Sequence, residues 1–289
     1  METILKKDKG ITLIELLVAL VISGLLIAAA YRIFIGQQKT YVVQEQVVDM
    51  QQNVRAAINR MMTEIRMANF GGNVSDVLPL NGFTQVITMN PTDITIVGAF
   101  MQVKDANGIP ITVILNNGNQ IILSAATGHF DGPVNGYISI GGLGSYKVNQ
   151  PTGITNVLTL DRTPTYAVGS YIFKIQAITY VCGKTDQDKP VLLRYENTYP
   201  TPIQPIVPRD DPNILGDNIE NIKFLYQYLD KDENLITTTD PSDVQKVQMI
   251  NVTAKATTDM YDPNLKGGDG YRRRQIASNI HLKNMGITP

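Results

Sequence analysis

The sequence has few residues suited to redox or metal chemistry. Cys182 is its only cysteine, and His129 and His281 are its only histidines among 289 residues. A single cysteine excludes an internal disulfide, a CxxC redox pair and a cysteine-based zinc site. The two histidines lie far apart and lack ligand spacing, so we expect both to be surface or structural residues. We therefore expect no cofactor and no histidine-dependent catalytic triad, whereas residue spacing alone leaves catalysis by paired carboxylates open.

An excess of charge of one sign is also absent. The formal net charge is −1, with 25 Lys and Arg against 26 Asp and Glu. This balance makes nucleic acid an unexpected partner, because nothing in it suggests binding through bulk electrostatics. The hydrophobic content of 43% and the charged content of 18% indicate a folded chain. Its length allows one large or two small domains.

Proline is missing from residues 11–70, and glycine and proline are both missing from residues 37–70. Within this stretch, apolar residues recur at steps of three or four, at Val43, Val47, Met50, Val54, Ile58, Met61, Ile65 and Ala68. That spacing predicts one buried helix face. Gly71 and Gly72 supply a stop signal. We therefore predict a single helix from Ile11 to Phe70, with an amphipathic second half.

The first part of this helix is apolar enough to cross a membrane. Ile11 to Ala30 is a run of 20 residues, which spans about 30 Å, the thickness of a hydrocarbon core. Three lysines precede the run and Arg32 follows it, which places the amino terminus in the cytoplasm and the rest outside. Glu15 is the only charged residue within the run. Its burial in lipid costs about 2.5–3.5 kcal/mol, so Glu15 is a functional candidate that needs a partner.

Three interpretations of this segment compete. An ordinary secretory signal, cleaved after Ala30 in "AAA" (28–30), would release a β-rich binding protein or hydrolase. A plain signal anchor also fits the apolar run. Neither interpretation explains Glu15, because a secretory signal gains nothing from an acid and a lone anchor would have to bury it.

The third interpretation comes from a family pattern. Gly10 followed by "ITLIELLVAL" resembles the prepilin leader of type IV pilins and type II secretion pseudopilins. The resemblance implies cleavage by a prepilin peptidase between Gly10 and Ile11, and N-methylation of Ile11, which stands where the family usually has Phe. The freed amine of one subunit would then pair with Glu15 of its neighbour. The implied partners are other major and minor pilins, an inner-membrane assembly platform, and membrane lipid before assembly.

After Gly72 the pattern changes to short β-branched runs separated by Gly, Pro, Asn and Asp, which predicts about ten strands. "NNGNQ" (116–120) is a hairpin signal. Val247, Met249 or Ile250, and Val252 are expected on one buried face. We predict an α+β fold in which the long helix packs on a predominantly antiparallel β head, as in pilins. The expected parts are a leader (1–10), a transmembrane half-helix (11–30), an amphipathic half-helix (31–70), a first head part (71–198), a proline-rich connector (199–213) and a second head part (214–289).

Residues 171–285 carry a second resemblance, to large minor pilins of the PilW type and to the J-type pseudopilin. "IQAITYVC", "VLLRYEN" and "RRRQIASNIHLKN" are among the segments that carry it. It implies a minor pilin that enters or primes a type IV pilus, with a type II secretion pseudopilin as the alternative. We expect such a pilin to be a structural protein with no enzymatic activity of its own. The expected location is the inner membrane with a periplasmic head, and then a pilus at the cell surface.

Three further motifs point only weakly to ligands. Asp230, Asp232 and Asn234 space like the start of a calcium loop, but Leu235 and Pro241 replace its glycine and glutamate. We expect a solvated turn there, and keep calcium binding by Asp230, Asp232 or Asp259 as an alternative. "RRR" (272–274) is expected to be a solvated strand start, with contact to an acidic subunit or DNA as the alternative. "GGLGS" (141–145) lacks the lysine of a phosphate loop and is expected to be a turn.

Overall fold

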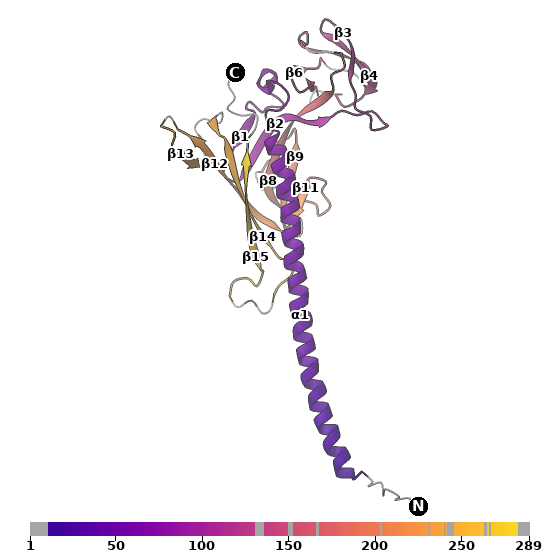
Figure 1. The fold of residues 1–289 in the computed structure, drawn as a ribbon, viewed down its shortest axis with the longest axis vertical. Helices are drawn as coiled ribbons and strands as arrows, with labels where there is room; N and C mark the ends of the chain where they lie inside the picture. The colour runs from indigo at the N-terminus through magenta and orange to yellow at the C-terminus, as the bar shows by residue number, and fades with distance from the viewer. Residues whose placement is uncertain are drawn as a thin grey trace, which may run out of the picture. The chain divides into compact units, whose positions relative to one another are not determined.

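The computed structural model describes residues 11–130, 136–149, 153–165, 168–202, 204–230, 232–239, 241, 246–262, 265 and 267–282. The chain divides into two compact units, Met1–Asp49 and Met50–Pro289. Helix α1 (Leu13–Arg66) begins in the first unit and ends in the second. The β-strands lie in the second unit and are almost all antiparallel (Figure 1). The predicted α+β architecture, one long amino-terminal helix followed by antiparallel sheets, is confirmed.

The carboxyl end of α1 lies four residues before the predicted end at Phe70. Beyond Arg66 the backbone bonds to strand β2 (Asp93–Gln102) instead of continuing the helix. The N–H of Asn69 donates to the carbonyl of Val97 at 2.9 Å, and the N–H of Ala99 donates to the carbonyl of Phe70 at 2.7 Å. Asn69 has a φ of 61°, a left-handed conformation that ends a helix. Pairing with a strand therefore stops the helix before the two glycines do.

The predicted apolar stripe of the helix is buried from Met50 onward. Its six members in the second unit are each at most 3% exposed: Met50, Val54, Ile58, Met61, Ile65 and Ala68. Val43 and Val47 keep intermediate exposure. Gly216 allows close packing against this face, because a Cβ built there would lie 3.1 Å from the Cβ of Ala57. The stripe therefore supplies helical side chains to the core of the second unit.

An eight-stranded sheet is built around the long strand β8 (Ile172–Thr185). Strand β2 pairs with one edge of β8, whereas β5 and β9 pair with the other. Among the described strands, the one parallel pair is formed by β10, inside the proline-rich stretch 199–213, with the end of β8. The remaining members of the sheet are β1 (Ile87–Met89), β5 (Tyr137–Ile140), β6 (Gly144–Lys147), β9 (Pro190–Glu196), β10 (Ile206–Val207) and β11 (Ile214–Asp217).

A four-stranded antiparallel sheet follows in the order β13-β12-β14-β15 (Figure 1, orange to yellow). Its strands are β12 (Ile219–Leu229), β13 (Leu235–Thr238), β14 (Met249–Thr257) and β15 (Arg273–His281). The expected buried face is present, since Val247, Ile250 and Val252 are fully buried. Of the two residues proposed for the middle position, Ile250 points inward and Met249 is only half-buried. The opposite face of this sheet is largely exposed.

A small third sheet has the order β3-β4-β7, formed by β3 (Val113–Asn117), β4 (Gln120–Thr127) and β7 (Thr155–Thr159). The predicted hairpin joins its first two strands, because Asn117 pairs with Gln120 across a two-residue turn. Gly118 has a φ of 64°, which a residue with a Cβ rarely adopts. A short 3-10 helix, η1 (Val74–Val77), lies between α1 and the first strand.

The buried stripe of α1 predicts a simple test of packing. Ile58→Ala should lower the free energy of unfolding by about 2–5 kcal/mol, because it leaves a cavity in a core that holds a fully buried side chain. Asn59→Ala, one residue along on the exposed side, should change it by less than about 0.5 kcal/mol. Denaturant unfolding of the detergent-solubilised chain measures both variants. Equal effects would contradict the packing described here.

Candidate functional site

Glu15 lies in the first turn of α1 and caps its amino terminus. Its Oε2 accepts hydrogen bonds from the backbone N–H and the hydroxyl of Thr12, both at 2.9 Å. In return, the N–H of Glu15 donates to the Thr12 hydroxyl at 3.3 Å. This reciprocal pair is a capping box, which satisfies backbone donors that a helix start leaves unpaired. This role of Thr12 was not predicted from the sequence, although the T-x-x-E spacing signals it.

The capping box occupies only one oxygen of the Glu15 carboxylate. Among the described residues, none donates a hydrogen bond to Oε1. Gly10, the predicted processing residue, lies outside the described residues, whereas Ile11 is described and 76% exposed. The carboxylate is thus held at the start of the helix with one acceptor oxygen open.

The helix around Glu15 exposes an apolar surface. One 18-residue window of α1 has a mean hydropathy of 2.6, and none of its residues is buried. Leu13, Leu20 and Leu26, for example, are 81%, 67% and 66% exposed. Length and composition therefore make this helix able to cross a membrane, and its apolar surface requires a non-aqueous neighbour.

A second polar cluster, unrelated to the amino terminus, joins α1 to the large sheet. The hydroxyl of Tyr180 on β8 donates to Oε2 of Glu64. Nε of Arg194 on β9 donates to the same oxygen at 2.9 Å, and its Nη1 donates to Oε1 of Glu196 at 2.5 Å. The side chains of Glu64 and Arg194 are only 15% and 12% exposed. We call Glu64, Tyr180, Arg194 and Glu196 the helix clamp.

Burial and neighbouring charges fix the protonation of the helix clamp. Burial raises the pKa of Tyr180 well above its usual value, and the Glu64 carboxylate raises it further. Burial alone would lower the pKa of Arg194, but its hydrogen bonds to Glu64 and Glu196 raise it. A neutral phenol and a charged guanidinium therefore face Glu64 at neutral pH. This cluster was not predicted from the sequence, because Glu64 lies 116 and 130 residues before Tyr180 and Arg194.

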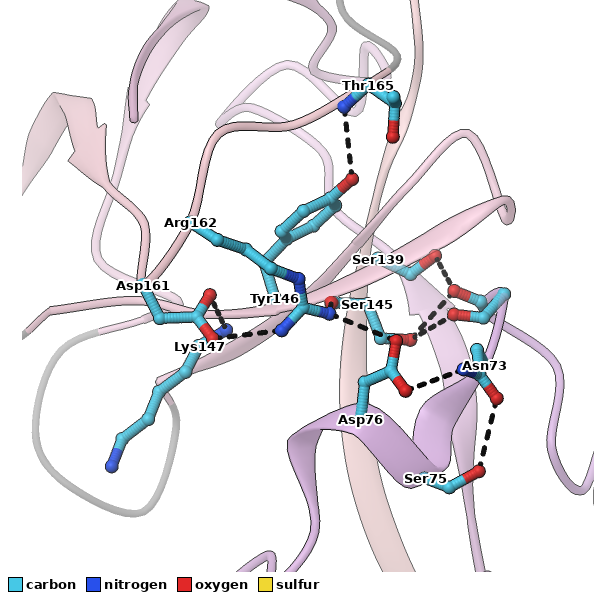
Figure 2. A network of polar contacts seen from close by, with 12 residues as sticks. Asn73, Ser75, Asp76, Ser139, Ser145, Tyr146, Lys147, Asp161, Arg162 and Thr165 are labelled. Atoms are coloured by element: carbon cyan, nitrogen blue, oxygen red, sulfur yellow. Dashed lines mark hydrogen bonds and ion pairs between the residues drawn. The ribbon is translucent and has the colours of Figure 1, made fainter. Parts of the chain in front are cut away.

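The segment that follows α1 is tied to the β5–β6 hairpin by buried serines (Figure 2). The hydroxyl of Ser139 donates to the carbonyl of Gly71 at 2.7 Å. The hydroxyl of Ser145 is placed to donate to the carbonyls of Gly71 and Gly72, at 2.8 and 2.9 Å. Both serines are at most 1% exposed. Because buried carbonyls are costly to leave unpaired, these bonds stabilise the exit from the helix.

Arg162 extends this network at the surface (Figure 2). Its guanidinium lies 5.0 Å from the centre of the Tyr146 ring and donates to the carbonyl of Ser145 at 2.5 Å. It also pairs with Asp76 of η1 at 3.3 Å and with Asp161 at 3.1 Å. These groups are substantially exposed, so the ion pairs add little stability. The network positions η1 against the hairpin, and its charges are mutually paired.

The three aspartates proposed for calcium do not come together. Asp230 follows one end of the β12–β14 ladder, near the Gln227–Met249 pair, and Asp259 follows the other end, near Ala256. Eight strand residues separate these ends, a distance of about 25 Å. Backbone N–H groups, led by that of Asn234, lower the pKa of Asp230, whose Oδ1 also accepts the N–H of Asp232. In the part of the chain that the structure describes, no three His, Cys, Asp or Glu side chains form a metal-ligand group.

The other motifs lie where the sequence placed them. Arg272 pairs with Asp262 at 2.7 Å, and Arg273, the first residue of β15, pairs with Glu220 at 2.8 Å. Residues 141–143 form the turn between β5 and β6, with positive φ at Gly141 and Gly142. Burial raises the pKa of the Cys182 thiol to about 12, which makes it unreactive near neutral pH.

The helix clamp predicts that the Glu64 charge stabilises the second unit. Glu64→Gln should lower the free energy of unfolding by about 1–3 kcal/mol, because a neutral amide satisfies the buried Arg194 less well. Glu45→Gln, at an exposed position of the same helix, is the matched control. In an Arg194→Met background the effect of Glu64→Gln should shrink, which a double-mutant cycle measures. An undiminished effect would show that the two side chains do not interact.

A family model described as the prokaryotic N-terminal methylation motif matches residues 5–31 of the chain. The matched segment contains Gly10, Ile11, Thr12 and Glu15, and extends over the apolar first part of α1. No curated protein and no solved structure matches the chain. The comparisons therefore identify the amino-terminal segment, and leave the head to be interpreted from its own geometry.

Proposed function

Since this chain is a type IV prepilin-like protein, we propose that it acts as a minor pilin, which enters or primes a type IV pilus. The methylation motif marks a type IV pilin-like or pseudopilin-like prepilin. Such a prepilin is processed by a prepilin peptidase and assembles with other pilins, and proteins with this motif are structural proteins rather than enzymes. The apolar amino-terminal helix also fits a protein anchored in the inner membrane.

The geometry of Glu15 carries the proposal. Cleavage between Gly10 and Ile11 would create an amine one residue before Thr12, which already bonds Oε2 of Glu15. No described residue donates to Oε1, so this oxygen can accept a hydrogen bond from the cleaved amine of a neighbouring subunit. Two unit charges 4 Å apart attract by about 4 kcal/mol at an effective dielectric of 20. This attraction is comparable to the cost of placing the acid in lipid, so pairing offsets that cost and sets the axial register between subunits.

In this proposal, the β-rich second unit has a role different from that of the amino-terminal helix. Once the apolar helix is in the filament interior, the second unit presents its sheets to the surroundings. The size of that unit and the second resemblance, to PilW-type proteins, support a minor pilin over a smaller major pilin. A type II secretion pseudopilin is the alternative, and a deletion separates the two roles, since loss of pili supports the first and loss of secretion the second.

The mature amino terminus is the first test. Mass spectrometry of the chain purified from its native membrane should find a start at Ile11, and a further 14 Da where that residue is methylated. Gly10→Val should leave the leader attached, because the family pattern places the cleavage directly after a glycine. A chain starting at Tyr31 would instead indicate ordinary secretion and overturn the proposal. Helix α1 continues through Ala28–Ala30, which favours retention of the segment.

Variants of Glu15 separate its capping role from its charge. Glu15→Gln keeps an oxygen that accepts the Thr12 N–H but removes the charge, whereas Glu15→Ala removes both. If the charge recruits a neighbouring amine, both variants should reduce incorporation into sheared filaments at least tenfold, as loss of about 1.4 kcal/mol implies. Quantitative immunoblots of filament and membrane fractions measure the ratio. Wild-type incorporation of Glu15→Gln would show that Glu15 acts only as a cap.

A further inference from the structure

Among the strands that the structure describes, β15 forms a long open edge of the four-stranded sheet. It pairs with β14 over nine residues, from Arg273 to His281, and is the last strand in the sheet order. Within the described residues, the other strands that end a sheet are short, with two residues in β10, three in β1, four in β6, β11 and β13, and five in β3 and β7. Short edges give little template for pairing with another chain. The length of β15 sets it apart.

The hydrogen bonds at both ends of the ladder show which backbone groups face outward. The N–H of Thr258 donates to the carbonyl of Arg272 at 2.8 Å, and the N–H of Leu282 donates to the carbonyl of Gln248 at 2.9 Å. In an antiparallel pair, hydrogen-bonded positions alternate. The even-numbered residues of β15 therefore bond to β14. The backbone N–H and C=O groups of the odd-numbered residues point to the open edge. These residues are Arg273, Gln275, Ala277, Asn279 and His281.

The usual protections of an edge strand are missing from most of β15. The run from Gln275 to His281 contains no Lys, Arg, Asp, Glu or Pro. Its register with β14 is unbroken, so no bulge turns the edge away. The five odd-numbered residues are all exposed. Backbone groups that lie in a straight, accessible row can bond an added strand.

We propose that the open edge of β15 binds an extended strand of a different subunit in the assembled filament. The inference rests on the proposed function, because it takes the partner from the same assembly. The partner strand is uncharged opposite residues 275–281, where the edge itself carries no charge. It has a carboxylate near Arg274, which is exposed and has no ion pair among the described residues. Its neighbour Arg273 is already paired with Glu220 and Asp269.

A second copy of β15 fits this edge less well. If two copies of β15 paired in antiparallel orientation with Ala277 opposite Ala277, Arg274 of one copy would lie opposite Ile280 of the other. Each Arg274 would then remain without a carboxylate. A different subunit with an acidic strand end satisfies both the backbone and the charge.

Proline at Ala277 tests the edge directly. The N–H of Ala277 points outward, so Ala277→Pro removes no bond to β14 but blocks the centre of an added strand. Thr237→Pro is the matched control on the opposite edge of the same sheet. On that side of the sheet, the backbone N–H of Phe224 donates to the carbonyl of Pro91, and the backbone N–H of Asp230 donates to the carbonyl of Asn234. The backbone groups of the even-numbered residues of β12 therefore point toward β13. Thr237 therefore also points outward, and its substitution gives up only one exposed side-chain hydrogen bond, to Gln227.

Sheared filaments and the detergent-purified full chain provide the readouts. Ala277→Pro should reduce the ratio of filament to membrane protein at least about tenfold, and Thr237→Pro should leave it unchanged. Hydrogen exchange of the wild-type chain gives a measurement that needs no variant. The amides of the odd-numbered residues should exchange rapidly in the purified chain and be protected in filaments, whereas those of the even-numbered residues should be protected in both.

The outcomes distinguish this inference from the proposed function. If wild-type protein is absent from filaments, the proposed function fails and takes this inference with it. If wild type is present, unprotected odd-numbered amides and normal incorporation of Ala277→Pro would overturn the strand edge alone. Protection that appears in the purified chain and increases with its concentration would show a second copy at the edge, and overturn the assignment to a different subunit.

Discussion

The burial of one stripe of α1 is the constraint on which the second unit depends. From Met50 to Ile65 the helix places one side chain every three or four residues into the core, with almost no exposed area. Burial of that kind favours contact but is non-directional, so on its own it leaves the helix free to slide or rotate. Glu64 removes this freedom, because one carboxylate oxygen accepts both Tyr180 and Arg194 from two neighbouring strands. Packing supplies the stability, and the helix clamp supplies the position.

Local patterns made the helix and its buried face predictable. A step of three or four places side chains on one face wherever the chain is helical, so Met50, Ile58 and Ile65 could be assigned without knowledge of what covers them. The hairpin at 116–120 was predictable for the same reason, since Gly118, which has a positive φ, lies in its two-residue turn. The helix end was placed too late because Asn69 bonds to Val97, a partner 28 positions away that propensity does not report.

The candidate functional residues show the same difference between contacts that are local in the sequence and contacts between distant residues. Glu15 and Thr12 lie three residues apart, so both the acid and its cap are present in a short motif, and only the cap was overlooked. The helix clamp and the serines that hold Gly71 join residues more than 65 positions apart. The spacing of residues within a helix or strand gives no information about contacts between residues this far apart in the sequence. The open edge of β15 could not be predicted either, because whether a strand lies at an edge depends on the order of the strands in the sheet.

The groups that this chain leaves unsatisfied share one physical logic. Within the part of the chain that the structure describes, the helix exposes apolar side chains, one oxygen of Glu15 has no donor, and alternate N–H and C=O groups of β15 have no strand beside them. Water satisfies the strand edge at little cost, but it does not satisfy the helix, and lipid does not satisfy the acid. The apolar helix surface, the Glu15 oxygen and the backbone groups of β15 therefore differ in how much free energy is lost without a partner. In the assembly that we propose, the helix and its acid require a membrane and then a neighbouring subunit, whereas the strand edge adds specificity once that neighbour is in place.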